Sequence, residues 1–367
     1  MWVIALIGIT LTSVQALLTV VFRRRRARAV RFDGFVSILK PVCGLDDQLE
    51  ENLVSFTALK GIWYEVIVSA EDEEDPALEI VRGVMRAHPF APFRIVVDAG
   101  SRTGVVNRKV ERLIAAARVA RGDVLLISDS SVRTGRDALA PTLGAFDDPR
   151  VGCVSNLFTG FGARSLGATI ESLHLLGFVV PGAVLAAAAR VPCVVGKSMA
   201  IRRSVLASIG GFERFRHVLA EDQAIALAVR EVGYDVMLSP VVVRNVVVHR
   251  SVRQAVERQV RWNKIRYSFS HRLYACELVL NPLPFAIAVA VVAPALLLAV
   301  LLLRYVQFAV VNHATRAGLS WRQLAAVPLL DLLMLYAWFV PFFSNEITWR
   351  GYRARIGRET QILQIAA

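Results

Sequence analysis

The chain has 367 residues, which is enough for one sizeable α/β domain and additional elements. Hydrophobic residues make up 55% of it and its mean hydropathy is +0.49, values that favour membrane segments over a wholly soluble protein. The formal net charge of +13 leaves nucleic acid, anionic lipid headgroups and anionic small molecules open as partners. The four cysteines show no CxxC and no zinc-like spacing, which argues against a disulfide framework or a zinc site.

The first 22 residues predict a transmembrane helix, because Trp2 to Phe22 carries no charge and is long enough to cross a bilayer. A basic run follows at once, with Arg23 to Arg26 and then Arg28. A secretory signal places its positive charges before the apolar stretch, so this order argues against a cleaved signal. By the positive-inside rule we expect the N-terminus outside and the next region in the cytoplasm.

Residues 31–250 change pattern and predict an α/β catalytic domain built as one unit. Short apolar runs rich in Val and Ile alternate with longer amphipathic stretches, which indicates a mostly parallel sheet with helices on both faces. The predicted strands are Val36–Leu39, Glu65–Ser69, Arg94–Val97 and Val124–Ser128. The predicted helices are Leu49–Leu59, Ala77–Ala87, Val106–Ala120 and Asp137–Phe146.

Acidic residues follow two of these strands, where ligands bind in such sheets. The segment Glu71–Asp75 follows one strand, and we interpret Glu73, Glu74 and Asp75 as caps of the next helix. Asp129 follows a buried strand and is a stronger candidate for a ligand-binding carboxylate. Asp222 begins a predicted helix, Asp222–Glu231, where it is either a helix cap or a functional carboxylate.

Residues 251–280 predict an amphipathic basic helix at a membrane surface. It contains Arg258-Gln259-Val260-Arg261-Trp262. Trp offers a flat apolar face to a sugar or base, and Arg pairs with phosphate through two parallel hydrogen bonds. Surface attachment and ligand binding are compatible here.

Residues 281–343 contain two more apolar segments, Asn281–Leu303 and Gln323–Phe343. We expect Asp331, within the second, to lie buried against a neighbouring helix or in a re-entrant segment. The basic tail, 344–367, suits the cytoplasmic side, so three crossings in total are consistent at both ends. Three arginines lie between the two segments: Arg304, Arg316 and Arg322. They leave open that one of the two segments lies in the membrane interface instead of crossing the bilayer.

These residues suit glycosyl transfer from a nucleoside diphosphate. The leaving diphosphate gains negative charge, which a divalent metal or cationic side chains must stabilise. The acceptor hydroxyl must lose a proton to a nearby carboxylate. Mg²⁺ and Mn²⁺ prefer carboxylate and phosphate oxygens, so Asp129 suits the metal and Asp222 suits the base.

The motifs resemble those of the ceramide glucosyltransferases, glycosyltransferase family 21, and the resemblance covers nearly the whole chain. Related hopanoid glycosyltransferases are similar too. The matching segments are Ser37–Pro41 with Gly44 and Asp46, Glu51–Leu53, Asp72 with Asp75–Ala77, Gly104 with Asn107 and Lys109, Asp129–Ser131 with Arg133, Gly196–Met199 with Arg202 and Arg203, Glu221-Asp222, Arg258–Trp262, and Ile347–Gly351. Three Asp residues and RxxRW, in this order between membrane segments, carry the resemblance.

The resemblance implies a GT-A fold and an inverting transfer of a hexose, glucose from UDP-glucose, to a membrane lipid. It assigns nucleotide binding to Asp72, the Mg²⁺ or Mn²⁺ ion to Asp129, and the general base to Asp222. Donor binding would also involve the cationic and aromatic residues Lys109, Lys197, Arg258, Arg261 and Trp262. The expected partners are the UDP-sugar, the lipid acceptor and the bilayer, in a multi-pass protein of the bacterial inner membrane.

Two departures from the family pattern bear on the metal site and on the acceptor, respectively. Asp129-Ser130-Ser131 lacks the second carboxylate of Asp-x-Asp, and Asn107-Arg108-Lys109 replaces Asn-Pro-Lys. Ceramide is the expected acceptor, with a hopanoid or a diacylglycerol as alternatives. A processive polysaccharide synthase and a non-catalytic membrane-surface protein are the competing hypotheses. Nucleic-acid binding is the weakest, since the basic residues gather near the membrane segments.

Overall fold

We describe a computed structural model over residues 1–25, 32–100, 106–349 and 352–364. The chain divides into two compact units. The helical unit comprises Met1–Arg24, Thr159–Leu185 and Val247–Ala367, and the sheet unit comprises Arg25–Phe158 and Ala186–Val246. Of the residues singled out above, Arg26, Arg28, Gly104, Arg350 and Gly351 lie outside the described ranges.

The sheet unit is built on an eight-stranded sheet with the order β3-β2-β1-β4-β7-β6-β8-β5. The strands are β1 Val36–Pro41, β2 Tyr64–Ala70, β3 Phe93–Val97, β4 Val124–Ser128, β5 Val132–Arg133, β6 Val151–Phe161, β7 Ser198–Arg202 and β8 Asp235–Val246. Strands β1 to β4 pair in parallel, and β7 runs antiparallel to β4. The predicted α/β fold with a mostly parallel sheet is confirmed.

The predicted strands lie within two residues of the observed β1 to β4. The helices of this unit are α2 Leu49–Val54, α3 Pro76–Ala87, α4 Arg108–Val119, α5 Leu139–Leu143, α8 Arg203–Ser208 and α9 Glu221–Glu231. Two predicted helices were too long: α2 ends at Val54, and Asp137–Phe146 gives only α5 and a 3₁₀ turn at Gly144–Asp147. Pro76 begins α3 behind the cap Asp75, whose carboxylate accepts from Ala77 N, which confirms the capping interpretation of Asp75.

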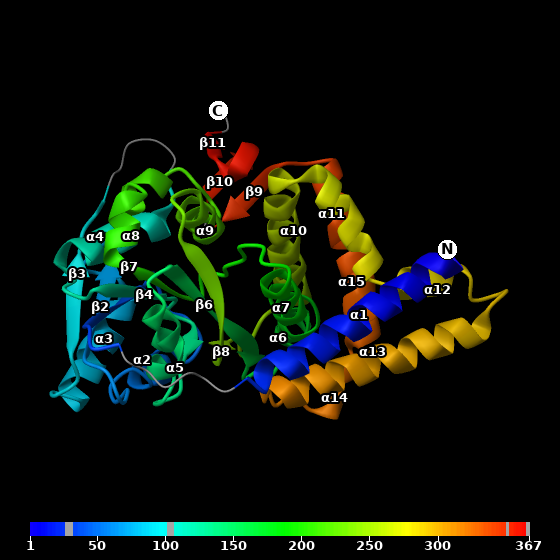
Figure 1. The fold of residues 1–367 in the computed structure, drawn as a ribbon, viewed down its shortest axis with the longest axis horizontal. Coiled ribbons are helices and arrows are strands. Elements are labelled where there is room, and N and C mark those ends of the chain that lie inside the picture. Colours follow the sequence, from blue (N-terminus) through cyan, green and yellow to red (C-terminus); the bar gives the residue numbers. More distant parts are fainter. Residues whose placement is uncertain (26–31, 101–105, 350–351, 365–367) are drawn as a thin grey trace. The chain divides into compact units, whose positions relative to one another are not determined.

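Helices α4, α8 and α9 cover one side of the sheet, and α2, α3 and α5 lie on the other (Figure 1). Ile67 and Leu125 of the sheet pack in one buried cluster with Leu113 of α4 and Ile225 of α9. Because α4 and α9 share this core, their first turns are held at fixed positions on the sheet.

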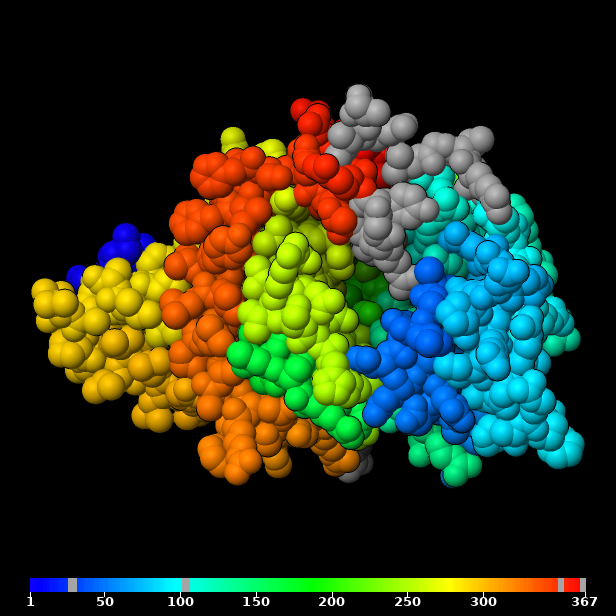
Figure 2. All heavy atoms as spheres, turned by 180° about the vertical axis from the view of Figure 1, so that it is seen from behind, coloured from blue at the N-terminus to red at the C-terminus, as the bar shows by residue number. Residues whose placement is uncertain are grey.

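The helical unit contains the apolar helices and a small sheet. Its helices are α1 Trp2–Arg23, α6 Leu166–His174, a π-helical turn Leu175–Val179, α7 Val180–Ala188, α10 Val252–Phe269, α11 His271–Glu277, α12 Leu283–Ala288, α13 Pro294–Thr315, α14 Trp321–Leu324 and α15 Val327–Phe339. The strands β9 Glu346–Trp349, β10 Tyr352–Ile356 and β11 Ile362–Gln364 form an antiparallel sheet. In the space-filling view α15, in orange, lies alongside α10, in yellow-green (Figure 2).

Among the described residues three helices are long and apolar enough to cross a membrane: Trp2–Arg23, Leu166–Ala188 and Pro294–Thr315. The first was predicted. The second was not, because it lies inside the region that we read as one α/β domain. The segment expected at Asn281–Leu303 is interrupted after α12, and the long helix begins at Pro294 and continues to Thr315.

The segment Gln323–Phe343 is shorter than a membrane span, since its main helix covers Val327–Phe342 with the 3₁₀ turn included. Asp331 is fully buried within it and pairs with Arg304 of α13, which confirms the expectation that Asp331 packs against a neighbouring helix. Arg304 therefore lies inside a helix rather than in the connecting loop.

Candidate active site

Asp129 lies at the carboxyl end of β4, and sheet register places a lysine beside it. Ser128, the last residue of β4, pairs with Ser198, the first residue of the antiparallel β7. The residue before Ser198 is Lys197, whose carbonyl accepts a hydrogen bond from Asp129 N at 3.2 Å. The antiparallel register thus brings the start of β7 to the ligand-binding edge of the parallel strands.

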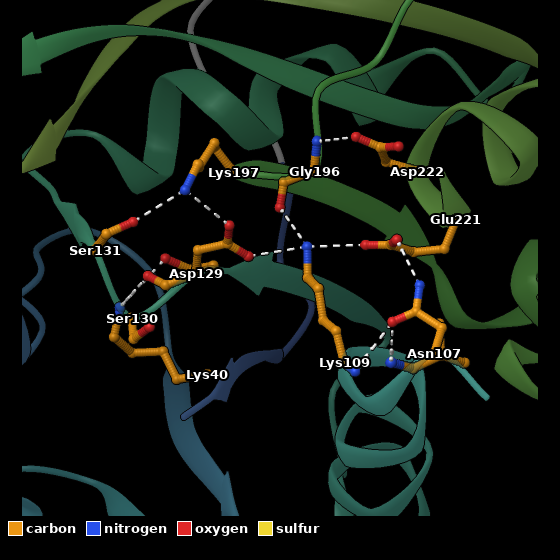
Figure 3. Close-up of polar contacts among 12 residues, drawn as sticks. Lys40, Asn107, Lys109, Asp129, Ser130, Ser131, Gly196, Lys197, Glu221 and Asp222 are labelled. Atoms are coloured by element: carbon orange, nitrogen blue, oxygen red, sulfur yellow. Dashed lines mark hydrogen bonds and ion pairs between the residues drawn. The ribbon is translucent and has the colours of Figure 1, made fainter. Parts of the chain in front are cut away.

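Two ammonium groups hold the Asp129 carboxylate (Figure 3). Lys109 Nζ lies 2.9 Å from Oδ1 and Lys197 Nζ lies 3.1 Å from Oδ2. Burial alone would raise the pKa of Asp129, but the two lysines keep it far below its usual range. Lys197 Nζ also donates to Ser131 Oγ at 3.0 Å, so the residue that replaces the second carboxylate of Asp-x-Asp binds a lysine.

Lys109 connects Asp129 to Glu221, a residue that sequence analysis left without a role. Lys109 Nζ lies 2.9 Å from Glu221 Oε1, and Figure 3 shows the ammonium group between the two carboxylates. Burial lowers the pKa of Lys109, yet Asp129 and Glu221 outweigh burial and raise it above the usual range. Lys109 is therefore a permanent cation.

Asn107 explains why Lys109 and Glu221 meet although they are far apart in sequence. Its side-chain oxygen caps α4 by accepting from Lys109 N at 3.0 Å. Its amide nitrogen donates to Glu221 Oε2 at 3.1 Å and to Val218 O at 2.8 Å. Arg108 follows as the first helical residue, a position that also accepts proline, so replacing Asn-Pro-Lys by Asn-Arg-Lys is compatible with the helix start.

Asp222 lies in the first turn of α9, and Gly196 joins it to the lysine cluster. Gly196 N donates to Asp222 Oδ2 at 2.5 Å, while Lys109 Nζ donates to Gly196 O at 3.2 Å. The cap of α9 is Ala220, so the alternative that Asp222 is merely the helix cap is wrong. Burial and the neighbouring Glu221 raise the pKa of Asp222 to about 6, which leaves it a carboxylate of increased basicity at neutral pH.

A buried lysine supports the Asp129 segment from below. Lys40, fully buried on β1, donates to Asp129 O at 2.9 Å and lies 4.1 Å from the centre of the Phe56 ring. Burial lowers the pKa of Lys40 to about 7. Ser130 contributes a further tie through a short hydrogen bond to Asp46. The matches at Lys40 and Asp46 thus correspond to side chains that hold the Asp129 segment, which their residue types alone did not predict.

Of the other predicted site residues, one belongs to the sheet unit and three belong to the helical unit. Asp72 is exposed after β2, and its carboxylate accepts from Glu74 N at 3.0 Å within its own turn. Arg258, Arg261 and Trp262 lie on α10 in the helical unit. The structure therefore brings together Lys109, Asp129, Lys197 and Asp222 of the predicted set and adds Glu221 and Lys40.

The residues at Asp129 fit a divalent ion in one specific way. Among the residues that the structure describes, no group of three or more His, Cys, Asp or Glu side chains could hold a metal by itself. Mg²⁺ in phosphate-transferring sites is commonly held by one or two carboxylates together with substrate phosphates. Asp129, ionised and next to the serine hydroxyls, fits the arrangement in which one carboxylate holds the ion together with substrate phosphates.

The family model "Glycosyl transferase family 21" matches residues 1–362. The chain belongs to glycosyltransferase family 21. It is 29% identical over 254 residues to ceramide glucosyltransferase 1 of Caenorhabditis elegans, covering 66% of this chain and 52% of that protein. It is 24% identical over 352 residues to ceramide glucosyltransferase 3 of the same organism, covering 89% and 74%. The matched region spans about half the length of the first of these relatives.

The fold of this family 21 glycosyltransferase resembles that of a solved mannosyltransferase from Pyrobaculum calidifontis, described as a complex with GDP-Man and Mn²⁺. The TM-score is 0.52 at 18% identity, with 93% of this chain and 99% of that one covered. At this identity the likeness establishes the fold, and the roles of individual residues rest on the geometry given above.

Proposed function

We propose that this enzyme transfers glucose from UDP-glucose to a hydroxyl of ceramide with inversion, giving a β-glucosylated lipid. The main support is the link through Gly196, whose N–H donates a hydrogen bond to Asp222 and whose carbonyl accepts one from Lys109. A carboxylate of raised pKa thereby stands next to a cationic cluster, which supplies the two electrostatic requirements of glycosyl transfer. The ceramide glucosyltransferase relatives support the choice of sugar and lipid.

In the proposed reaction Asp222 accepts the proton of the lipid hydroxyl. The hydroxyl oxygen forms a bond to the anomeric carbon, on the face opposite the diphosphate. The bond from that carbon to the diphosphate oxygen breaks, and UDP leaves with the electron pair. An α-linked donor thus gives a β-linked product. The Gly196 and Gln223 N–H groups, at 2.5 and 2.8 Å from the two carboxylate oxygens, orient the base.

Lys109 and Lys197 would stabilise the charge that develops on the leaving diphosphate. Both are partly buried and paired with Asp129, with side chains 17% and 20% exposed, and so are held in place before substrate binds. A Mg²⁺ or Mn²⁺ ion on Asp129 would add Lewis-acid stabilisation of the same leaving group. Asp72 would bind the nucleotide, and Arg258, Arg261 and Trp262 would bind the diphosphate or frame the acceptor.

We further propose a multi-pass protein of the bacterial inner membrane with its sheet unit in the cytoplasm. The charge order at α1, with Arg23 as its last residue and Arg24 and Arg25 directly after it, supports this orientation. Lipid acceptors are confined to the bilayer, so an enzyme with apolar helices long enough to span it can take them directly.

The test is lipid mass spectrometry on a host that expresses the chain and is fed ceramide, with Asp222→Asn as the comparison. Purified protein in detergent, given UDP-sugars and lipid acceptors, identifies the donor. We expect one hexose per lipid in the wild type and a loss of at least about a hundredfold in the variant. Glucosylated hopanoid or diacylglycerol would change the acceptor, a sugar polymer would indicate a polysaccharide synthase, and full transfer by Asp222→Asn would remove the base assignment.

A further inference from the structure

An acidic residue lies buried within one of the apolar helices. Glu171 belongs to α6, in the segment Leu166–Ala188 that is long and apolar enough to cross a membrane. Its side chain is only 3% exposed. Carboxylates in such helices are costly to bury and usually pair with a cation that serves a function.

The partners of Glu171 are two arginines near the start of α10. Glu171 Oε1 lies 3.2 Å from Arg258 Nε, and Glu171 Oε2 lies 3.1 Å from Arg250 Nε. Arg258 is the first residue of the RxxRW sequence and is itself buried, with its side chain 8% exposed. One carboxylate thus holds the motif to α6.

The rest of the Arg258 side chain lies on an aromatic ring and leaves two of its nitrogens without an acceptor among the described residues. Its guanidinium carbon lies 4.0 Å from the centre of the Trp262 ring, one helical turn away, so the ring supports one face of the plane. Its Nη1 and Nη2 atoms are buried and have no hydrogen-bond partner among the described residues. Buried guanidinium nitrogens without acceptors are costly, unless a bound oxygen group accepts from them.

Contacts at Ser165 and Gly167 hold the start of α6 against the start of α10. Ser165 Oγ donates to Arg250 O at 2.8 Å and accepts from Arg250 N at 2.9 Å. Gly167 lies so close to α10 that a Cβ there would stand 2.3 Å from Ser251 O. The distance from Glu171 to Arg258 is therefore set by the fold rather than by flexible side chains.

We infer that Glu171 is a positioning residue that aims Arg258 Nη1 and Nη2 at phosphate oxygens of the nucleotide donor. Glu171 pairs with Nε of Arg258, and the Trp262 ring covers one face of the guanidinium plane. The two outer nitrogens remain as a fork that matches two oxygens of one phosphate. The inference rests on the proposed function, because it takes the ligand to be a nucleoside diphosphate.

The test measures UDP and UMP binding to the full chain in detergent, for the wild type and Glu171→Gln. We expect Glu171→Gln to weaken UDP binding about tenfold and UMP binding less than twofold, since one charge-assisted contact to the outer phosphate is lost. A general loss of structure would weaken the binding of UDP and of UMP to the same extent. Arg258→Gln should reproduce the effect, and adding Glu171→Gln to it should weaken UDP binding no further.

Glu257→Gln is the matched control, because Glu257 is an exposed carboxylate of α10, next to Arg258, that pairs with Arg253 at 2.8 Å. It should leave the UDP-to-UMP ratio unchanged. Should Glu171→Gln fail to fold, the Glu171→Gln, Arg258→Gln pair removes both charges together and must still bind UMP with wild-type affinity and UDP about tenfold more weakly. Equal losses for UDP and UMP, or additive losses in the double variant, would overturn the positioning role. A wild type that binds neither nucleotide would overturn the proposed function and this inference with it.

Discussion

Asp331 and Arg304 form a two-pronged ion pair inside the helical unit. Arg304 Nε lies 2.9 Å from Oδ2 and Nη2 lies 2.7 Å from Oδ1, with both side chains at most 3% exposed. Gln307, which accepts from Arg304 Nη1, donates to Ile9 O and so connects the pair to α1. The pair therefore ties together α1, α13 and α15. Of these, α1 and α13 are long and apolar enough to span a membrane.

Asp331→Leu should destabilise the protein by about 3 kcal/mol or more, because it leaves the Arg304 charge buried without its partner. The Asp331→Leu, Arg304→Leu double variant should recover most of that loss, since two apolar side chains can replace a buried ion pair. Thermal unfolding in detergent measures both. A single variant as stable as the wild type would show that Arg304 finds another acceptor.

Asp222→Asn should abolish most activity without loss of stability. In the wild type, burial and Glu221 raise the pKa of the Asp222 carboxyl, so the folded state favours its protonated form more than the unfolded state does. The stability that proton uptake contributes is complete below the unfolded pKa, near 4, and is lost as the pH rises through about 6. At pH 7.5 the neutral Asn should thus raise stability, by about 1 kcal/mol after allowance for partial exposure. A lower melting temperature would mark Asp222 as a structural residue.

The rate of transfer should fall below about pH 6, as Asp222 becomes protonated. We expect the rate constant at saturating substrates to drop about tenfold for each pH unit beneath that value. Glu221→Gln should shift this acidic limb of the pH–rate profile to lower pH, because the Glu221 charge helps to raise the pKa of Asp222. An unchanged limb in Glu221→Gln would assign it to a different group.

Mn²⁺ should bind weakly to the free enzyme and at least about tenfold more tightly with UDP present. Both Asp129 oxygens already face ammonium groups, and a cation gains further ligands only when phosphates arrive. Electron paramagnetic resonance of free Mn²⁺ measures this coupling directly. Tight binding of the ion without nucleotide would require a second set of ligands.

Lys109→Met should weaken UDP binding by about tenfold or more and also lower stability, because Asp129 and Glu221 lose the cation between them. Lys60→Met, at an exposed lysine of the same unit, serves as the control. Calorimetry with UDP and a thermal melt report the two effects. Wild-type affinity in Lys109→Met would remove this lysine from the donor site.

The local elements of the sheet unit could be predicted, since runs such as Val124–Ser128 are buried on both faces and therefore apolar throughout. The Glu221 contact could not, because it depends on Asn107 holding a loop more than a hundred residues away. The helix α13 was misplaced for a related reason. Arg304 ended the uncharged stretch, although Asp331 on α15 neutralises it in the fold.

The helix Leu166–Ala188 was missed because it carries little periodic contrast. Glu171 and His174 are buried like their apolar neighbours, so no polar face marks the helix. Their partners, Arg258 and Trp262, come from a segment some ninety residues later. The RxxRW sequence was recognisable from its residue types, but the carboxylate that pairs with its first arginine was not.

Gly196 has a practical consequence for anyone who redesigns this enzyme. A methyl group there would stand 3.0 Å from the Asp222 carboxylate and 3.1 Å from Lys109 Nζ, so even alanine would press on both. Mutant libraries aimed at new sugars or new acceptors should leave this position fixed and vary the residues around it. A residue that contributes only its backbone to the site then limits the choice of side chains around it.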